Sequence, residues 1–101
     1  METLRALASR LDEAAATAGA AASRVARIEP PASAFGADGP GELADQGRDL
    51  HSRWVAVIGA RTREAAAVAD RLADLAAGVR QAAHSYAETD HAAHRRHPGQ
   101  A

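Results

Sequence analysis

The first 28 residues carry a hydrophobic repeat whose spacing alternates between three and four residues. The repeat consists of Leu4, Leu7, Leu11, Ala14, Ala18, Ala21, Val25 and Ile28. This heptad pattern predicts a helix over about residues 2–28 that lies alongside another helix. The helix is expected to end before Pro30 and Pro31, because proline lacks an N–H and disfavours helical geometry in the residue before it.

A segment rich in proline and glycine follows, and it is predicted to be a loop over residues 29–41. Its sequence "PPASAFGADGPG" contains three prolines and three glycines. Phe35 and Gly36 are placed at the turn, and Phe35 is the only large apolar side chain of the segment. The sequence leaves open whether Phe35 packs onto the helices or contacts a partner.

A second helix is predicted over about residues 42–94, because Pro40 suits a helix start and a hydrophobic row runs through this stretch. The row consists of Leu43, Leu50, Trp54, Ile58, Ala65, Leu72, Leu75, Val79, Ala82 and Tyr86. The dipeptide Pro98-Gly99 is expected to end the helical part of the chain. The sequence therefore predicts an all-α fold, a single antiparallel helical hairpin over residues 1–95 with a flexible tail at 96–101.

The two predicted helices differ in length. At 1.5 Å per residue, a helix of about 27 residues spans roughly 40 Å and one of about 50 residues roughly 75 Å. Folded back about the loop, the first helix is expected to reach only the neighbourhood of Val68. Four apolar residues of the second helix would then have no partner within the chain: Leu72, Leu75, Val79 and Tyr86. An exposed row of this kind predicts an interface, in which a hairpin of the same or another chain completes a four-helix bundle as a dimer.

The composition also indicates that a partner is needed. Although 47% of the residues are hydrophobic, much of that fraction is alanine, and the chain has one Phe, one Trp, one Tyr and one Met. Burying a Leu or Val side chain stabilises a fold by roughly 1.5–3 kcal/mol, whereas one methylene contributes about 0.8 kcal/mol. A monomeric core is expected to be thin. Trp54 is interpreted either as part of that core or as an interface anchor, since Trp is enriched among binding hot spots.

Several classes of function are disfavoured. A formal net charge of -1 argues against a nucleic-acid binder, and the absence of cysteine excludes disulfides and thiolate zinc sites. No serine lies in a nucleophile elbow and no glycine-rich phosphate loop is present, so we expect neither an enzyme nor a small-molecule substrate. The histidines at 91, 94 and 97 have spacing that can suit a metal, but a solvated, pH-sensitive tail is the favoured interpretation, with no metal and no cofactor.

The first residues do not look like a cleaved Sec signal. Charged side chains interrupt the segment "METLRALASRLDEAAA", and nothing in the chain approaches the ~20 apolar residues that span a bilayer. We therefore expect a soluble protein that stays in the cytoplasm unless it is exported by another route.

Tyr86, the only tyrosine, precedes Asp90 by four residues, so the phenol and the carboxylate share one helical face. Tyr86 is either the end of a hydrophobic seam or, with Asp90, a surface read by another protein.

The stretch "YAETD" at 86–90 matches the Y-x-x-x-D export signal of actinobacterial type VII (ESX) secretion substrates, and the chain resembles their EspC-like group. It departs from the related Trp-x-Gly hairpin proteins, because Trp54 is followed by Val55 and Ala56. The resemblance implies export without a cleaved signal, often as a helical dimer, with Tyr86 and Asp90 recognised by the secretion ATPase. The protein would then be cytoplasmic before export and secreted or in the cell envelope afterwards. The alternative is an intracellular dimeric helical-bundle adaptor or scaffold.

Overall fold

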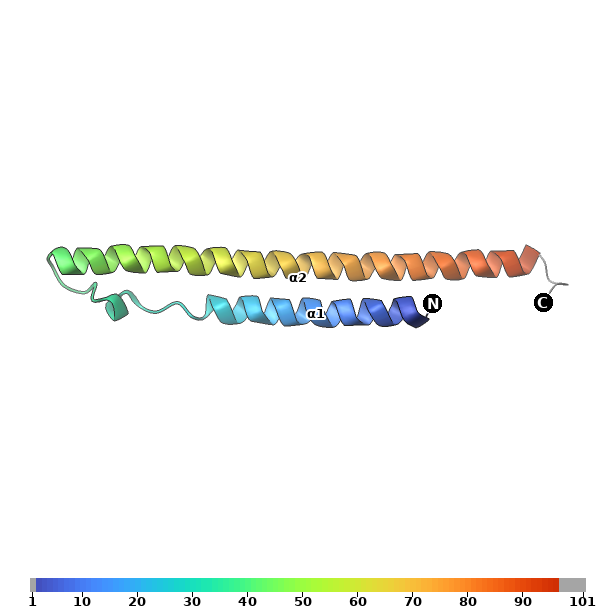
Figure 1. Cartoon of the computed structure of the whole chain (residues 1–101), viewed down its shortest axis with the longest axis horizontal. Helices are drawn as coiled ribbons and strands as arrows, with labels where there is room; N and C mark the ends of the chain where they lie inside the picture. The colour runs from blue at the N-terminus through green and yellow to red at the C-terminus, as the bar shows by residue number, and fades with distance from the viewer. Residues whose placement is uncertain (1, 97–101) are drawn as a thin grey trace. The chain divides into compact units, whose positions relative to one another are not determined.

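The computed structural model describes residues 2–96, which form two α-helices and one short 3-10 helix (Figure 1). The helix α1 spans Glu2–Ala26, the 3-10 helix η1 spans Ala32–Phe35, and α2 spans Glu42–Arg96. The described residues contain no strand, and the predicted all-α helical hairpin is confirmed. His97 and the Pro98-Gly99 helix stop lie outside the described residues.

The helix ends follow from local chemistry. The last turn of α1 tightens into i→i+3 bonds, in which the N–H groups of Arg27 and Ile28 donate to the carbonyls of Arg24 and Val25 at 3.1 and 3.0 Å. As a result α1 ends at Ala26, two residues before the predicted end. The helix α2 begins at Glu42, as predicted, and carries acidic residues in its first turn and basic residues in its last, which suits the helix dipole.

The chain divides into two units, each of which pairs a part of α1 with a part of α2. The first unit contains α1 up to Thr17 and α2 from Ala69 onward. The second unit runs from Ala18 to Val68 and includes the loop.

In the first unit, three alanines form the fully buried contact between the helices. Ala8 on α1 and Ala76 and Ala83 on α2 are at most 1% exposed. An ion pair between Asp12 and Arg80 also joins the two helices. The prediction that α1 reaches only to Val68 is therefore wrong, and Leu72 and Val79 are half-buried within the hairpin.

In the second unit, the loop lies against the start of α2 and sets where the end of α1 meets this helix. Residues 27–41 run back over the first turns of α2 before the helices pair. His51 Nε2 lies 3.1 Å from the carbonyl oxygen of Pro30, and the rings of Phe35 and His51 have centroids 5.5 Å apart. The end of α1 accordingly lies beside Val55, with which Ala26 lines a common pocket. The length estimate failed because it placed the C-terminal end of α1 beside residue 42, at the start of α2.

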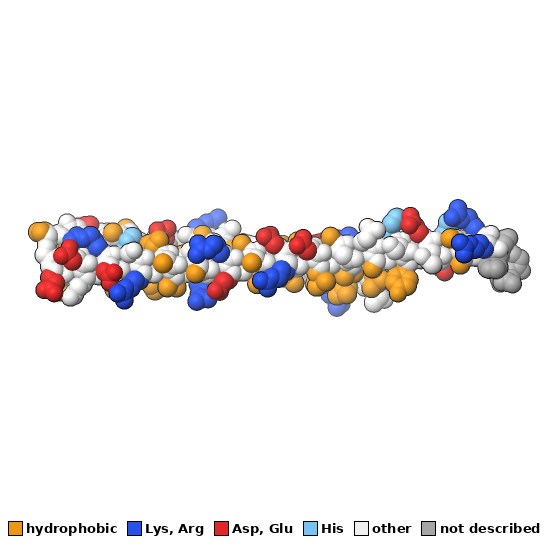
Figure 2. Space-filling view, turned by 90° about the horizontal axis from the view of Figure 1, so that it is seen from above, with side chains coloured by type: hydrophobic (Ala, Val, Ile, Leu, Met, Phe, Trp, Pro, Cys, Tyr) orange, Lys and Arg blue, Asp and Glu red, His pale blue; other side chains and the backbone are white. Residues whose placement is uncertain are grey.

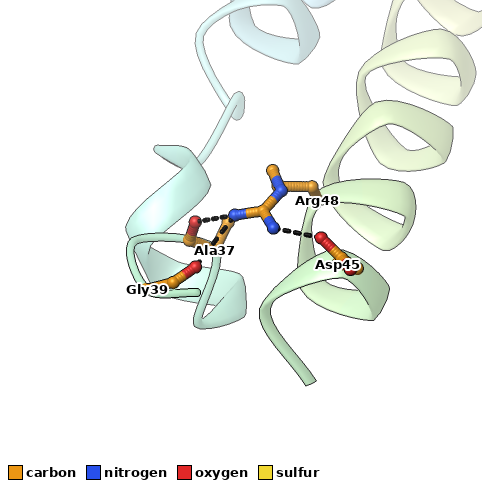
Figure 3. Close-up of polar contacts among 4 residues, drawn as sticks. All are labelled: Ala37, Gly39, Asp45 and Arg48. Atoms are coloured by element: carbon orange, nitrogen blue, oxygen red, sulfur yellow. Dashed lines mark hydrogen bonds and ion pairs between the residues drawn. The ribbon is translucent and has the colours of Figure 1, made fainter. Parts of the chain in front are cut away.

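Arg48 fixes the second half of this loop (Figure 3). Its guanidinium donates to the carbonyl oxygens of Ala37 at 2.7 Å and Gly39 at 3.1 Å, and it pairs with Asp45. Gly36 ends η1 in the left-handed region with φ 72°, which favours glycine. Phe35 and Gly36 thus lie in the turn, and Phe35 is half-buried against the chain's own helix.

The seam of α1 is displaced by one residue at alternate positions from the predicted one. Leu7 and Ala14 are exposed, whereas their C-terminal neighbours Ala8 and Ala15 are buried and half-buried, and Ala21 is half-buried beside the buried Ala22. Alanine occupies the buried positions because small side chains allow two helices to pack closely, near the short end of the usual interaxial distance of ~8–10 Å. The larger side chains then lie on the flanks, and among residues 2–96 no large side chain is fully buried.

Candidate functional site

The predicted hydrophobic row of the second helix is in fact two adjacent rows on α2. The first, which we call the inner row, is buried or half-buried and consists of Val55, Ile58, Thr62, Ala65, Ala69, Leu72, Ala76 and Val79. The second, the outer row, is exposed throughout and consists of Leu50, Trp54, Val57, Arg61, Glu64, Val68, Arg71 and Leu75. The prediction merged members of both rows, because residues at adjacent positions fit a loose three-four repeat equally well.

The outer row carries Trp54, the largest apolar side chain of α2, together with two leucines and two valines. Trp54 is 40% exposed, Leu75 is 55% exposed, and Leu50, Val57 and Val68 have similar exposure. Figure 2 shows hydrophobic side chains at the surface among charged groups on one face of the molecule. The four predicted interface residues therefore split. Trp54 and Leu75 are available to a partner, whereas Leu72 and Val79 belong to the inner row, and their assignment to an interface stays a prediction.

Tyr86 and Asp90 lie one turn apart near the C-terminal end of α2, and both side chains are exposed. Tyr86 is 62% exposed, so it does not act as a buried end of the seam in the hairpin. Within residues 2–96, neither side chain takes part in a hydrogen bond or an ion pair. The pair is thus presented to solvent without an intramolecular role that would account for it.

A shallow, mainly apolar groove of about 310 Å³ accompanies Tyr86 and is lined by Ala82, Ser85, Tyr86 and Thr89. Asp90 follows directly after the last of these residues. An apolar groove next to a free carboxylate is suited to a partner that offers an apolar side chain together with a hydrogen-bond donor. The sequence pointed to Tyr86 and Asp90 but gave no signal for Ser85 or Thr89, because small polar residues on a helix have no characteristic spacing.

A second groove, of about 420 Å³, lies between the helices of the first unit and is lined by Arg5, Ser9, Arg80 and His84. Two of these side chains already have partners within the first unit. Arg80 pairs with Asp12, and His84 Nε2 lies 3.1 Å from Glu88. The groove is lined by polar and charged residues, and it brings together residues far apart in sequence, which no local motif could have indicated.

Two further sequence questions concern metals and membranes. Within residues 2–96, no three His, Asp or Glu side chains are gathered closely enough to hold a metal ion. Over the same range, neither α1 nor α2 offers a stretch that is long and apolar enough to cross a membrane.

Comparisons with known proteins give no relative. No protein-family model, no curated protein and no solved structure matches the chain.

Proposed function

We propose that this protein is a small non-enzymatic substrate or accessory factor of an actinobacterial type VII (ESX) secretion system. The observation that carries the proposal is the exposed Tyr86–Asp90 pair, with Y-x-x-x-D spacing, in the final part of the second helix of a hairpin. A recognition signal has to be accessible in the folded protein, and both side chains meet that condition.

The proposed action is association with other proteins. Tyr86 and Asp90 would contact the secretion ATPase, and the exposed outer row would contact a second helical hairpin, either the same chain or a different one. The protein would be made in the cytoplasm and would leave it by a route independent of a signal peptide, to be secreted or kept in the cell envelope.

The test is a secretion assay in a host with an intact ESX system. The native chain is compared with Tyr86→Ala and Asp90→Asn, and the matched control is Asp74→Asn, another exposed carboxylate on α2. We expect the native chain and the control to reach the culture filtrate and both signal variants to stay in the cells. Circular dichroism should show equal helicity for all four proteins, because the substituted side chains are exposed.

Two results would contradict the proposal. Retention of the native chain would show that it is not a substrate of that system. Equal export of the Asp90→Asn variant would show that the carboxylate is not read.

An intracellular dimeric adaptor is the second candidate, and the apolar outer row favours it as much as it favours an exported dimer. Under this alternative, the protein is dimeric and all four chains remain in the cells.

A further inference from the structure

The outer row of α2 has a property that goes beyond its exposure. Its successive spacings are four, three, four, three, four, three and four residues, so the row has the same spacing in either direction. Two copies of such a row can therefore be laid antiparallel with every position of one opposite a position of the other. The point of symmetry falls between Thr62 and Arg63.

The side chains at equivalent distances from this point are chemically complementary. Leu50 is matched with Leu75, and Val57 is matched with Val68. At the centre, Arg61 is matched with Glu64, whose carboxylate lies 2.6 Å from the Arg61 guanidinium within the same helix.

From this complementarity we infer that the partner of the outer row is a second copy of this chain, with the two α2 helices packed antiparallel about the Thr62–Arg63 midpoint. The inference deepens the association proposed above by naming the partner, and it rests on the described side chains of α2 alone. In this arrangement Arg61 faces the partner's Glu64, and Glu64 faces the partner's Arg61. A two-fold axis repeats each contact, as a symmetric dimer requires.

The remaining pair is also favourable. Trp54 is matched with the partner's Arg71, which places a guanidinium beside an indole, and cations bind most strongly over the face of Trp. Arg71 is exposed, and within residues 2–96 it takes part in no ion pair. The pairing thus gives a role to a charge that would otherwise interrupt an apolar row.

The charges also disfavour other arrangements. A parallel pair would place Arg61 against the partner's Arg61 and Glu64 against the partner's Glu64. An antiparallel pair shifted by one heptad would place Arg61 against the partner's Arg71 in one direction, and against the partner's Val57 in the other, where the charge has no counter-charge. Because like charges facing each other at an interface are costly, the central charges select both orientation and register.

Charge reversal tests the pairing by sedimentation equilibrium of the full chain. Arg61→Glu and Glu64→Arg each create four like charges at the centre, so each should weaken dimerisation about 100-fold or more. An equimolar mixture of the two variants should dimerise again, because each pair across the interface then contains opposite charges. The control is Arg63→Glu, the same charge change on a side of α2 that faces away from the outer row, and it should leave the dimer intact.

Cysteine cross-linking tests the register, since the native chain has no cysteine. Positions 57 and 68 are separated by roughly 16 Å along one helix, too far for a disulfide within a chain. The Val57→Cys/Val68→Cys double variant should therefore form a disulfide-linked dimer on mild oxidation. Val57→Cys alone should not, because the two copies of residue 57 are also roughly 16 Å apart in the antiparallel register.

A monomeric native chain, a variant mixture that stays monomeric, or efficient cross-linking of Val57→Cys alone would overturn the inference. Its failure can be told from failure of the export proposal, because the two rest on different residues. A secreted monomer would refute the dimer only, and a dimer retained in the cells would refute export only.

Discussion

Gly47 on α2 lies directly against the backbone of Phe35 in the loop. A Cβ atom placed on residue 47 would stand 2.2 Å from the Phe35 carbonyl oxygen and 3.1 Å from its carbonyl carbon. Neither atom belongs to a flexible side chain, so the loop itself would have to move. A glycine inside a helix is ordinarily a weak point, whereas Gly47 is the position that lets the loop lie on α2.

We therefore predict that Gly47→Ala destabilises the protein by about 1–3 kcal/mol, although alanine is the better helix former. The matched control is Gly78→Ala, because nothing lies within 4 Å of a Cβ added there. That variant should be more stable than the native chain by roughly 0.5–1 kcal/mol. Urea unfolding at one fixed protein concentration measures both changes, and a stabilised Gly47→Ala would contradict the contact.

Arg48 should hold the loop through its two carbonyl contacts. Arg48→Ala removes the hydrogen bonds to Ala37 and Gly39, so we expect a loss of about 1–2 kcal/mol in the free energy of unfolding. Arg53→Ala serves as the control and should cost less than about 0.5 kcal/mol, because among residues 2–96 Arg53 pairs with the exposed Asp49 of the preceding turn alone. Equal effects of the two substitutions would show that Arg48 does not anchor the loop.

The alanine seam should not tolerate a larger side chain. Ala8 is 0% exposed between the helices of the first unit, so Ala8→Leu forces them apart and should cost about 1–3 kcal/mol. Ala6→Leu adds the same atoms at an exposed position of α1 and should change stability by less than about 0.5 kcal/mol. A more stable Ala8→Leu variant would mean that large side chains can fill the seam, contrary to the burial pattern.

The Asp12–Arg80 pair should contribute little energy despite joining the two helices. Both side chains are nearly half exposed, so a double-mutant cycle with Asp12→Asn and Arg80→Gln should give a coupling below about 1 kcal/mol. The coupling should shrink further in 0.5 M salt, because exposed charges are screened. A larger coupling that is insensitive to salt would show that the pair is buried in solution.

The sequence was sufficient for the elements and for their antiparallel arrangement. Hydrophobic periodicity located both helices, and Pro30 and Pro31 located the break between them. It did not give the register, because alanine scores as apolar both at a buried position such as Ala8 and at an exposed one such as Ala14. Only the close approach of two helices distinguishes these positions, and that is a tertiary effect.

The candidate site was predictable where it depended on local spacing. Tyr86 and Asp90 are exposed on one turn, as their separation suggests, whereas Leu72 and Val79 turned inward. Their burial depends on which residues of α1 pair with this part of α2, as Asp12 does with Arg80 in the first unit. Such contacts between distant residues leave no periodic trace in the sequence.

Each member of the outer row is followed at once by a half-buried or buried residue, from Leu50 and His51 to Leu75 and Ala76. Residues of the two faces of α2 thus alternate as neighbours in the sequence, and one face is turned from the other by the rotation of one residue, about 100°. Inserting one residue between His51 and Trp54 would turn Trp54, Arg61 and Glu64 toward α1 while the loop contacts stayed in place. In this helix, which side chains are exposed depends more on the number of residues that follow the loop than on the identity of most of those residues.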